Sequence, residues 1–170
     1  AGERYFIRSV KWFDKQIQDP ALKERVKAFI GQEVQHGMQH EKFLASLDQM
    51  GLDGSAWAGW YEKDAYRNDE KPSHESVWFD MLEKVIGKAA QQRIGLSITA
   101  ALEHYTASIA ETVLKNRDLH DGMPEDMRNM FMWHAAEEIE HKSVAFDVFK
   151  DVAHGGYGER MLGFTFGSFY

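Results

Sequence analysis

The chain has 170 residues, of which 44% are hydrophobic, 28% charged and 13% aromatic, a composition that is typical of a folded globular protein and not of a disordered one. The formal net charge of −7 leaves no basic surface to meet phosphates, so we expect no nucleic-acid partner. Cysteine is absent, which excludes disulfides, thiolate-bound zinc, iron–sulfur clusters and cysteine nucleophiles.

Helix-forming residues dominate the chain between its three prolines, at positions 20, 72 and 124, and alternating β-branched residues are nearly absent. We therefore predict an all-α protein whose residues 1–170 form one domain with four main helices. Glycines at 51 and 54, and again at 155 and 156, are expected to end the second and fourth helices. The predicted helices are 2–17, 21–50, a third that starts near 73 and ends near 116 with a break at Gly87, and 125–153.

Residues 52–72 are predicted to form a loop or short helices between the second and third helices. If the third helix ran antiparallel to the second from Ser73, Glu103 would overshoot Glu33 by about 20 Å, at about 1.5 Å of rise per residue. We therefore favour a long crossover connection over a short turn.

No run of about 18 apolar residues is present, so we expect no membrane span. No signal peptide is visible and cysteine is absent, so we expect a cytoplasmic protein. Both ends read as interrupted helical patterns, which indicates a part of a longer polypeptide. Several tryptophans are expected at the surface, and they favour a homodimer.

The second and fourth predicted helices each have one face, with members spaced by four and three positions, that is apolar except at its centre. Such a face normally packs against a core. Its apolar members are Leu22, Val26, Phe29, Phe43, Leu47 and Met50 in the second helix, and Met127, Phe131, Ala145, Val148 and Val152 in the fourth. Its polar members are Glu33, His36 and His40 in the second helix, and His134, Glu138 and His141 in the fourth.

The other two helices each have one acidic residue on the corresponding face. Glu103 interrupts a row of alanines in the third helix, and Glu3 lies on the face of Val10 in the first. Glu103 and Glu138 are almost equally far from the predicted turn near residue 120, as are Glu3 and His36 from the turn near Pro20. The polar residues of all four helices can therefore meet in one layer.

Burying several carboxylates together is prohibitive without cations, because desolvation and mutual repulsion both disfavour the ionised groups. Two divalent ions would balance four glutamates, and a Glu-x-x-His pair on each of two helices with a Glu on each of the others is a suitable ligand set. The alternative is a structural polar network, or for Glu3 an ordinary solvated side chain. The predicted metal ligands are Glu3, Glu33, His36, Glu103, Glu138 and His141, with His40 and His134 as further ligands or as hydrogen-bond partners of the ligands.

These motifs, "QEVQH", "LEHYTA" and "EEIEH", resemble those of the ferritin-like di-metal carboxylate superfamily. The longer stretches "GERYFIRSVKWF", "DPALKERVKAFIGQEVQHGMQHEKFL" and "WHAAEEIEHKSVAFDVF" resemble a bacterial family labelled predicted metal-dependent hydrolase. The resemblance covers nearly the whole chain. It implies a ferritin-like four-helix bundle with a long connection between its second and third helices and a truncated extra helix near residue 170.

The resemblance also implies a function that depends on two metal ions. The superfamily's usual chemistry is di-iron, so we expect two Fe ions, with Mn or Zn as alternatives, and oxygen-dependent oxidation of a small organic substrate. The family label gives the alternative of a di-metal hydrolase with a metal-activated water, for which Glu137 and His134 are the candidate bases. For Glu137 and Glu140 a solvated helix edge is the competing interpretation. Iron storage is the third hypothesis, although the aromatic residues fit a ferritin cage less well.

Overall fold

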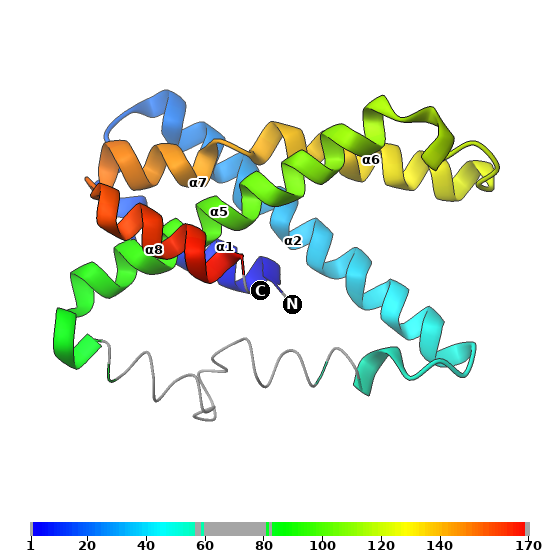
Figure 1. The fold of residues 1–170 in the computed structure, drawn as a ribbon, viewed down its shortest axis with the longest axis horizontal. Helices are drawn as coiled ribbons and strands as arrows, with labels where there is room; N and C mark the ends of the chain where they lie inside the picture. The colour runs from blue at the N-terminus through cyan, green and yellow to red at the C-terminus, as the bar shows by residue number, and fades with distance from the viewer. Residues whose placement is uncertain (1, 57–58, 60–80, 82, 169–170) are drawn as a thin grey trace.

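All secondary structure is helical in the computed structural model, which describes residues 2–56, 59, 81 and 83–168 (Figure 1). This confirms the predicted all-α class. Most of the predicted crossover, residues 52–72, and the predicted start near 73 lie outside the described residues. The helices are α1 (Gly2–Lys11), η1 (Asp14–Gln16), α2 (Pro20–Gln49), α5 (Lys88–Lys115), η2 (Arg117–Leu119), α6 (Glu125–His141), α7 (Val144–Asp147), the π-helix η3 (Val148–Val152) and α8 (Tyr157–Gly167).

Local signals explain the two ends of α2, which lie within one residue of the prediction. Asp19 caps the helix by accepting a hydrogen bond from the backbone N–H of Ala21 at 2.9 Å, and Pro20 occupies the first turn, where no amide donor is needed. At the other end Gly51 has a φ of 81°, and the N–H of Leu52 reaches back to the carbonyl of Leu47. This Schellman-type turn needs a residue without a Cβ, so Gly51 ends the helix.

Two predicted helices are divided. The helix predicted over 2–17 ends at Lys11 and continues as the 3₁₀ turn η1, whose tighter winding places both Phe13 and Ile17 in the core. The helix predicted over 125–153 ends at His141, and α7 and η3 follow. The hydroxyl of Ser143, at this break, accepts a hydrogen bond from Arg25 of α2 at 2.7 Å, an interaction that no local pattern shows. The break predicted at Gly87 is present before α5.

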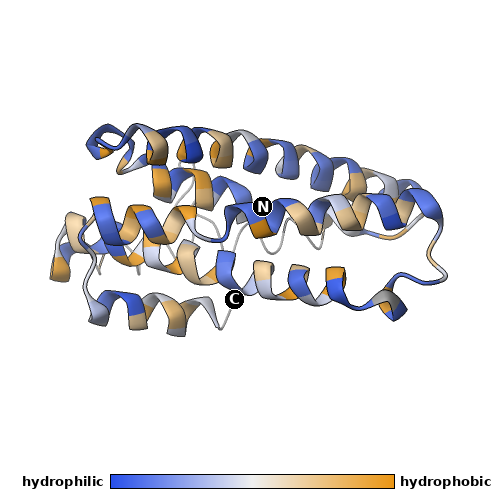
Figure 2. Cartoon of the chain, turned by 90° about the horizontal axis from the view of Figure 1, so that it is seen from above, coloured by the Kyte–Doolittle hydropathy of each residue, from blue (hydrophilic) through white to orange (hydrophobic). Residues whose placement is uncertain are grey.

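The main core lies at the end of the molecule where α1, α2, α5 and α7 meet. Helix α1 contacts α2 and α5, and α5 also contacts α6, α7 and α8 (Figure 1). None of the helices in the described ranges is long and apolar enough to cross a membrane, and Figure 2 shows hydrophilic residues along each of the long ones. The core residues are Val10, Phe13, Ile17, Leu22, Val26, Phe29, Leu96, Val144, Ala145, Val148 and Phe149.

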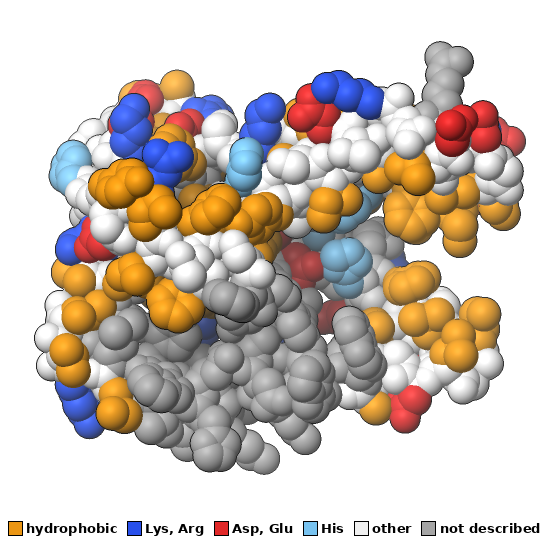
Figure 3. Space-filling model, in the orientation of Figure 1, with side chains coloured by type: hydrophobic (Ala, Val, Ile, Leu, Met, Phe, Trp, Pro, Cys, Tyr) orange, Lys and Arg blue, Asp and Glu red, His pale blue; other side chains and the backbone are white. Residues whose placement is uncertain are grey.

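The outer halves of the two predicted core faces are exposed, contrary to the sequence pattern. Phe43 and Met50 of α2 are 53% and 72% exposed, and Met127 and Phe131 of α6 are 45% and 40% exposed. The reason is geometric: the C-terminal part of α2 and the first turns of α6 diverge, so neither helix covers the other (Figure 1). Figure 3 shows an opening between them with hydrophobic side chains on both sides.

Helix α8 packs closely on α5, the helix that contains Glu103. A Cβ at Gly163 would lie 1.9 Å from Oγ of Ser97 and 2.6 Å from its carbonyl carbon, so no side chain fits there. The Ser97 hydroxyl lies 2.8 Å and 2.9 Å from the carbonyl oxygens of Ile94 and Glu159, which ties the two helices together.

We expect Gly163→Ala to lower the free energy of unfolding by about 1–3 kcal/mol, because a methyl group must push α8 off α5. Gly158→Ala is the matched control in the same helix, since a Cβ there meets nothing within 4 Å. Urea unfolding of both variants measures the difference. Equal stabilities of the two variants would contradict the close packing of α8 on α5.

Candidate metal centre

Buried ionisable side chains from three helices meet at the end of the core. Glu33 and His36 lie three residues apart on α2 and therefore share a face, and both are 2% exposed. Glu103 of α5 is 0% exposed and His141, the last residue of α6, is 2% exposed. The ring of His141 packs edge-on against Phe29, with the ring centres 5.5 Å apart, which connects this cluster to the hydrophobic core.

The Glu33 carboxylate lies between the two buried imidazoles. Its Oε1 is 3.9 Å from Nδ1 of His36 and 3.5 Å from Nδ1 of His141. Oε1 of Glu138, on α6, is 3.6 Å from the same His36 Nδ1. Both histidines therefore point Nδ1 toward carboxylates of the cluster.

Glu103 completes the cluster and has no counter-charge within the described residues. Both of its carboxylate oxygens are buried without a hydrogen-bond partner there, and so is Nδ1 of His141. Burial, followed by the nearby carboxylates of Glu33 and Glu138, raises the pKa of Glu103 well above its usual value. Burial likewise raises the pKa of Glu33, against the opposing effect of His141. The Glu103 oxygens and Nδ1 of His141 are therefore available as metal ligands, and a divalent cation would offset the repulsion between the neighbouring carboxylates.

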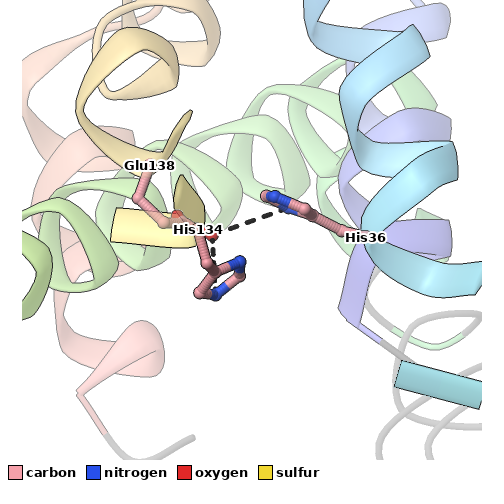
Figure 4. A group of neighbouring side chains, drawn as sticks. All are labelled: His36, His134 and Glu138. Carbon is pink, nitrogen blue, oxygen red and sulfur yellow. Dashed lines mark ion pairs between the residues drawn. The ribbon is translucent and has the colours of Figure 1, made fainter. Parts of the chain in front are cut away.

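His134 adds a third histidine, at the more open side of the cluster. One donor atom each from His36, His134 and Glu138 lies within 4.8 Å of the others, which is a suitable spacing for one metal ion (Figure 4). Nε2 of His134 is 3.6 Å from Oε1 of Glu138. The side chain of His134 is 35% exposed, and burial lowers its pKa, which favours the neutral form that can bind a metal.

The predicted ligand Glu3 lies beside this cluster, paired with His40. Its Oε1 is 2.5 Å from Nδ1 of His40, and the two side chains are 12% and 49% exposed. The hydrogen bond to Glu3 raises the pKa of His40 despite partial burial. Burial raises the pKa of Glu3, but the effects that lower it, of which the His40 hydrogen bond is the largest, prevail. The ring centres of His40 and His134 are 5.8 Å apart, so the pair borders the open side.

Two further side chains contact the buried histidines, and neither lies on the periodic faces that identify the other candidate residues. The interpretation of Glu137 as a solvated helix edge is wrong, because its side chain is only 12% exposed and Oε2 is 2.8 Å from Nε2 of His36. Its role as a base stays a prediction. Gln32 of α2 accepts a hydrogen bond at Oε1 from Nε2 of His141. Their position in the sequence could have indicated this role, because each residue directly precedes the glutamate of a Glu-x-x-His motif.

Comparison with known proteins gives one family. The family described as "Predicted metal-dependent hydrolase" matches residues 1–170. No curated protein and no solved structure matches the chain significantly.

Proposed function

We propose that this chain, which belongs to the predicted metal-dependent hydrolase family, is a divalent-metal enzyme that hydrolyses a small-molecule substrate. The observation that supports a metal site is the environment of Glu103. Its two buried oxygens have no partner within the described residues and lie near the carboxylates of Glu33 and Glu138. The family description supports hydrolysis as the reaction.

We further propose a ferritin-like ligand arrangement in a single domain with two ions. Four helices contribute to it: α1 and α5 each offer a glutamate, while α2 and α6 each offer a Glu-x-x-His pair, the pattern of di-metal carboxylate bundles. In this proposal His40 pairs with Glu3, and His134 is a ligand or a proton acceptor. The proposed ligands are Glu3, Glu33, His36, Glu103, Glu138 and His141.

A divalent ion held here would lower the pKa of a bound water and polarise a carbonyl or phosphoryl group of the substrate. The chain itself must accept the water's proton. His134 suits this role better than Glu137, because Glu137 already binds Nε2 of His36 whereas His134 is partly exposed and its pKa is lowered by burial. With Nε2 of His134 directed at Glu138, Nδ1 is the atom that would accept the proton.

A second candidate function is oxygen-dependent oxidation of a small substrate with two bound irons. The observation that favours it is the donor set, because four glutamates against two histidines offer mainly hard oxygen ligands, which suit iron or manganese. The hydrophobic side chains on both sides of the opening between α2 and α6 would suit an apolar substrate (Figure 3).

One pair of measurements separates the two reactions. We expect protein loaded with Zn²⁺ or Mn²⁺ to hydrolyse members of a panel of chromogenic esters and phosphoesters under nitrogen. Removing the base in His134→Ala is expected to lower that rate by about 10²–10⁴-fold. Protein loaded with Fe²⁺ under nitrogen is then mixed with oxygen in a stopped-flow spectrometer. A new visible absorption band there, together with no hydrolysis under nitrogen, would reverse the order of the two candidates.

A further inference from the structure

The two buried histidines are each held by a side chain of the opposite helix. Gln32 of α2 contacts His141 of α6, and Glu137 of α6 contacts His36 of α2. The two holding residues are also hydrogen-bonded to each other, with Nε2 of Gln32 3.4 Å from Oε1 of Glu137. This cross-linked arrangement joins the two Glu-x-x-His motifs outside the proposed ligand set.

The hydrogen-bond directions around Gln32 define the tautomer of His141. Carboxylates only accept hydrogen bonds, so the Gln32 amide nitrogen must face Glu137 and Glu140, each at 3.4 Å. The amide oxygen therefore faces Nε2 of His141, which must bear the proton. A neutral His141 then has its lone pair on Nδ1, the buried atom that lies 3.5 Å from Glu33 without a hydrogen bond.

The same reasoning applies to His36, with one difference. Glu137 accepts the proton of Nε2 at 2.8 Å, so Nδ1 of a neutral His36 turns its lone pair toward Glu138, 3.6 Å away. The difference is charge: His36 is held by a carboxylate and His141 by a neutral amide. A carboxylate partner makes an imidazole a more basic metal ligand than an amide does.

We propose that Gln32 and Glu137 are positioning residues that fix both histidines with Nδ1 toward the metal pocket, and that their unequal charge makes the His36 half of the pocket bind metal first. Only the second part of this proposal, the order of metal binding, rests on the proposed function. Its first part concerns the metal-free protein and stands on the hydrogen bonds described above.

Nitrogen NMR of the histidine rings in the metal-free protein tests the positioning. We expect both His36 and His141 to bear their proton on Nε2. In Gln32→Leu the His141 proton is expected to move to Nδ1, where the Glu33 carboxylate can accept it, while Gln32→Glu retains an acceptor and the original tautomer. Glu41→Gln is the matched control on the same helix as Gln32, because Glu41 is exposed and pairs with Arg4. An unchanged His141 tautomer in Gln32→Leu overturns the proposal.

Calorimetric titration with Mn²⁺ or Zn²⁺ tests the binding order. Loss of a side chain that hydrogen-bonds a ligand histidine typically weakens metal binding by about 10–100-fold. Glu137→Gln should therefore weaken binding of the first, tighter ion, and Gln32→Leu should weaken binding of the second ion. Gln32→Glu should bring the two affinities together. Identical effects of Glu137→Gln and Gln32→Leu on both steps overturn the order. Wild-type protein that binds no ion overturns the proposed function and the order, whereas the NMR result decides the positioning by itself.

Discussion

Glu103→Gln is expected to abolish metal binding and yet to stabilise the metal-free protein at neutral pH. Glu103 is fully buried, and its oxygens have no partner within the described residues. The ionised form is further opposed by Glu33 and Glu138. A neutral amide of the same shape removes this repulsion and is less costly to bury than an ionised carboxylate, so we expect the free energy of unfolding to rise by about 1–3 kcal/mol. With metal present the wild type should be the more stable of the two proteins, because only the wild type binds metal and is stabilised by it.

The pH dependence follows from the sign of the pKa shift. Because the pKa of Glu103 is higher in the folded chain than its ordinary value of 4.5, the folded chain binds a proton that the unfolded chain has already released. The stability of the metal-free wild type should therefore fall as the pH rises from about 4.5 through the raised pKa. Glu33, whose pKa is also raised, acts in the same direction.

Urea unfolding in the presence of a chelator, at intervals between pH 4.5 and 8, measures both effects. The Glu103→Gln variant should show a smaller slope with pH than the wild type. Glu111→Gln is the control on the same helix, because Glu111 is exposed and pairs only with Lys115 among the hydrogen bonds observed. A metal-free wild type that is more stable than Glu103→Gln throughout this pH range would contradict the assigned role of Glu103.

The parts of the fold that follow from local chemistry could be predicted. Asp19, Pro20 and Gly51 are neighbours of the helix that they delimit, so α2 was located within one residue. The break after His141 could not be predicted, because Ser143 binds Arg25, 118 residues earlier in the chain. Periodicity identified the apolar face that includes Phe43, but which helix would cover that face is a question of tertiary packing, and α2 and α6 diverge there.

The candidate site was predictable to a similar extent. Polar residues inside an otherwise apolar face indicate a buried function, and this identified Glu33, His36 and Glu103, all of which are buried. Their role as metal ligands stays a prediction. Gln32 and Glu137 lie beside the apolar faces and not on them, so periodicity gave no reason to select them. Their partners are 109 and 101 residues away in the chain, and only the packing of α2 beside the end of α6 brings them together.

Glu138→Ala should remove the proposed metal ions with the largest effect of any single α6 substitution. Oε1 of Glu138 lies 3.6 Å from both His36 Nδ1 and His134 Nε2, and its charge acts on Glu33 and Glu103. It therefore borders both the buried and the open side of the cluster. We expect about two divalent ions per chain in the wild type, as in di-metal carboxylate bundles, and none retained by the variant.

Elemental mass spectrometry on protein purified without chelator gives the metal content, and thermal unfolding gives its consequence. Ions at 100 times their dissociation constant stabilise a protein by about 2.7 kcal/mol, so the wild type should lose stability on chelation and Glu138→Ala should not. Glu140→Ala is the matched control, because Glu140 lies two residues away on α6 but is exposed. If the wild type contains no metal and takes none up from an anaerobic Fe²⁺, Mn²⁺ or Zn²⁺ solution, the cluster is a buried polar network. The raised pKa of Glu103 would then reflect only its burial and the neighbouring carboxylates of Glu33 and Glu138, which together favour the neutral form of the carboxyl group.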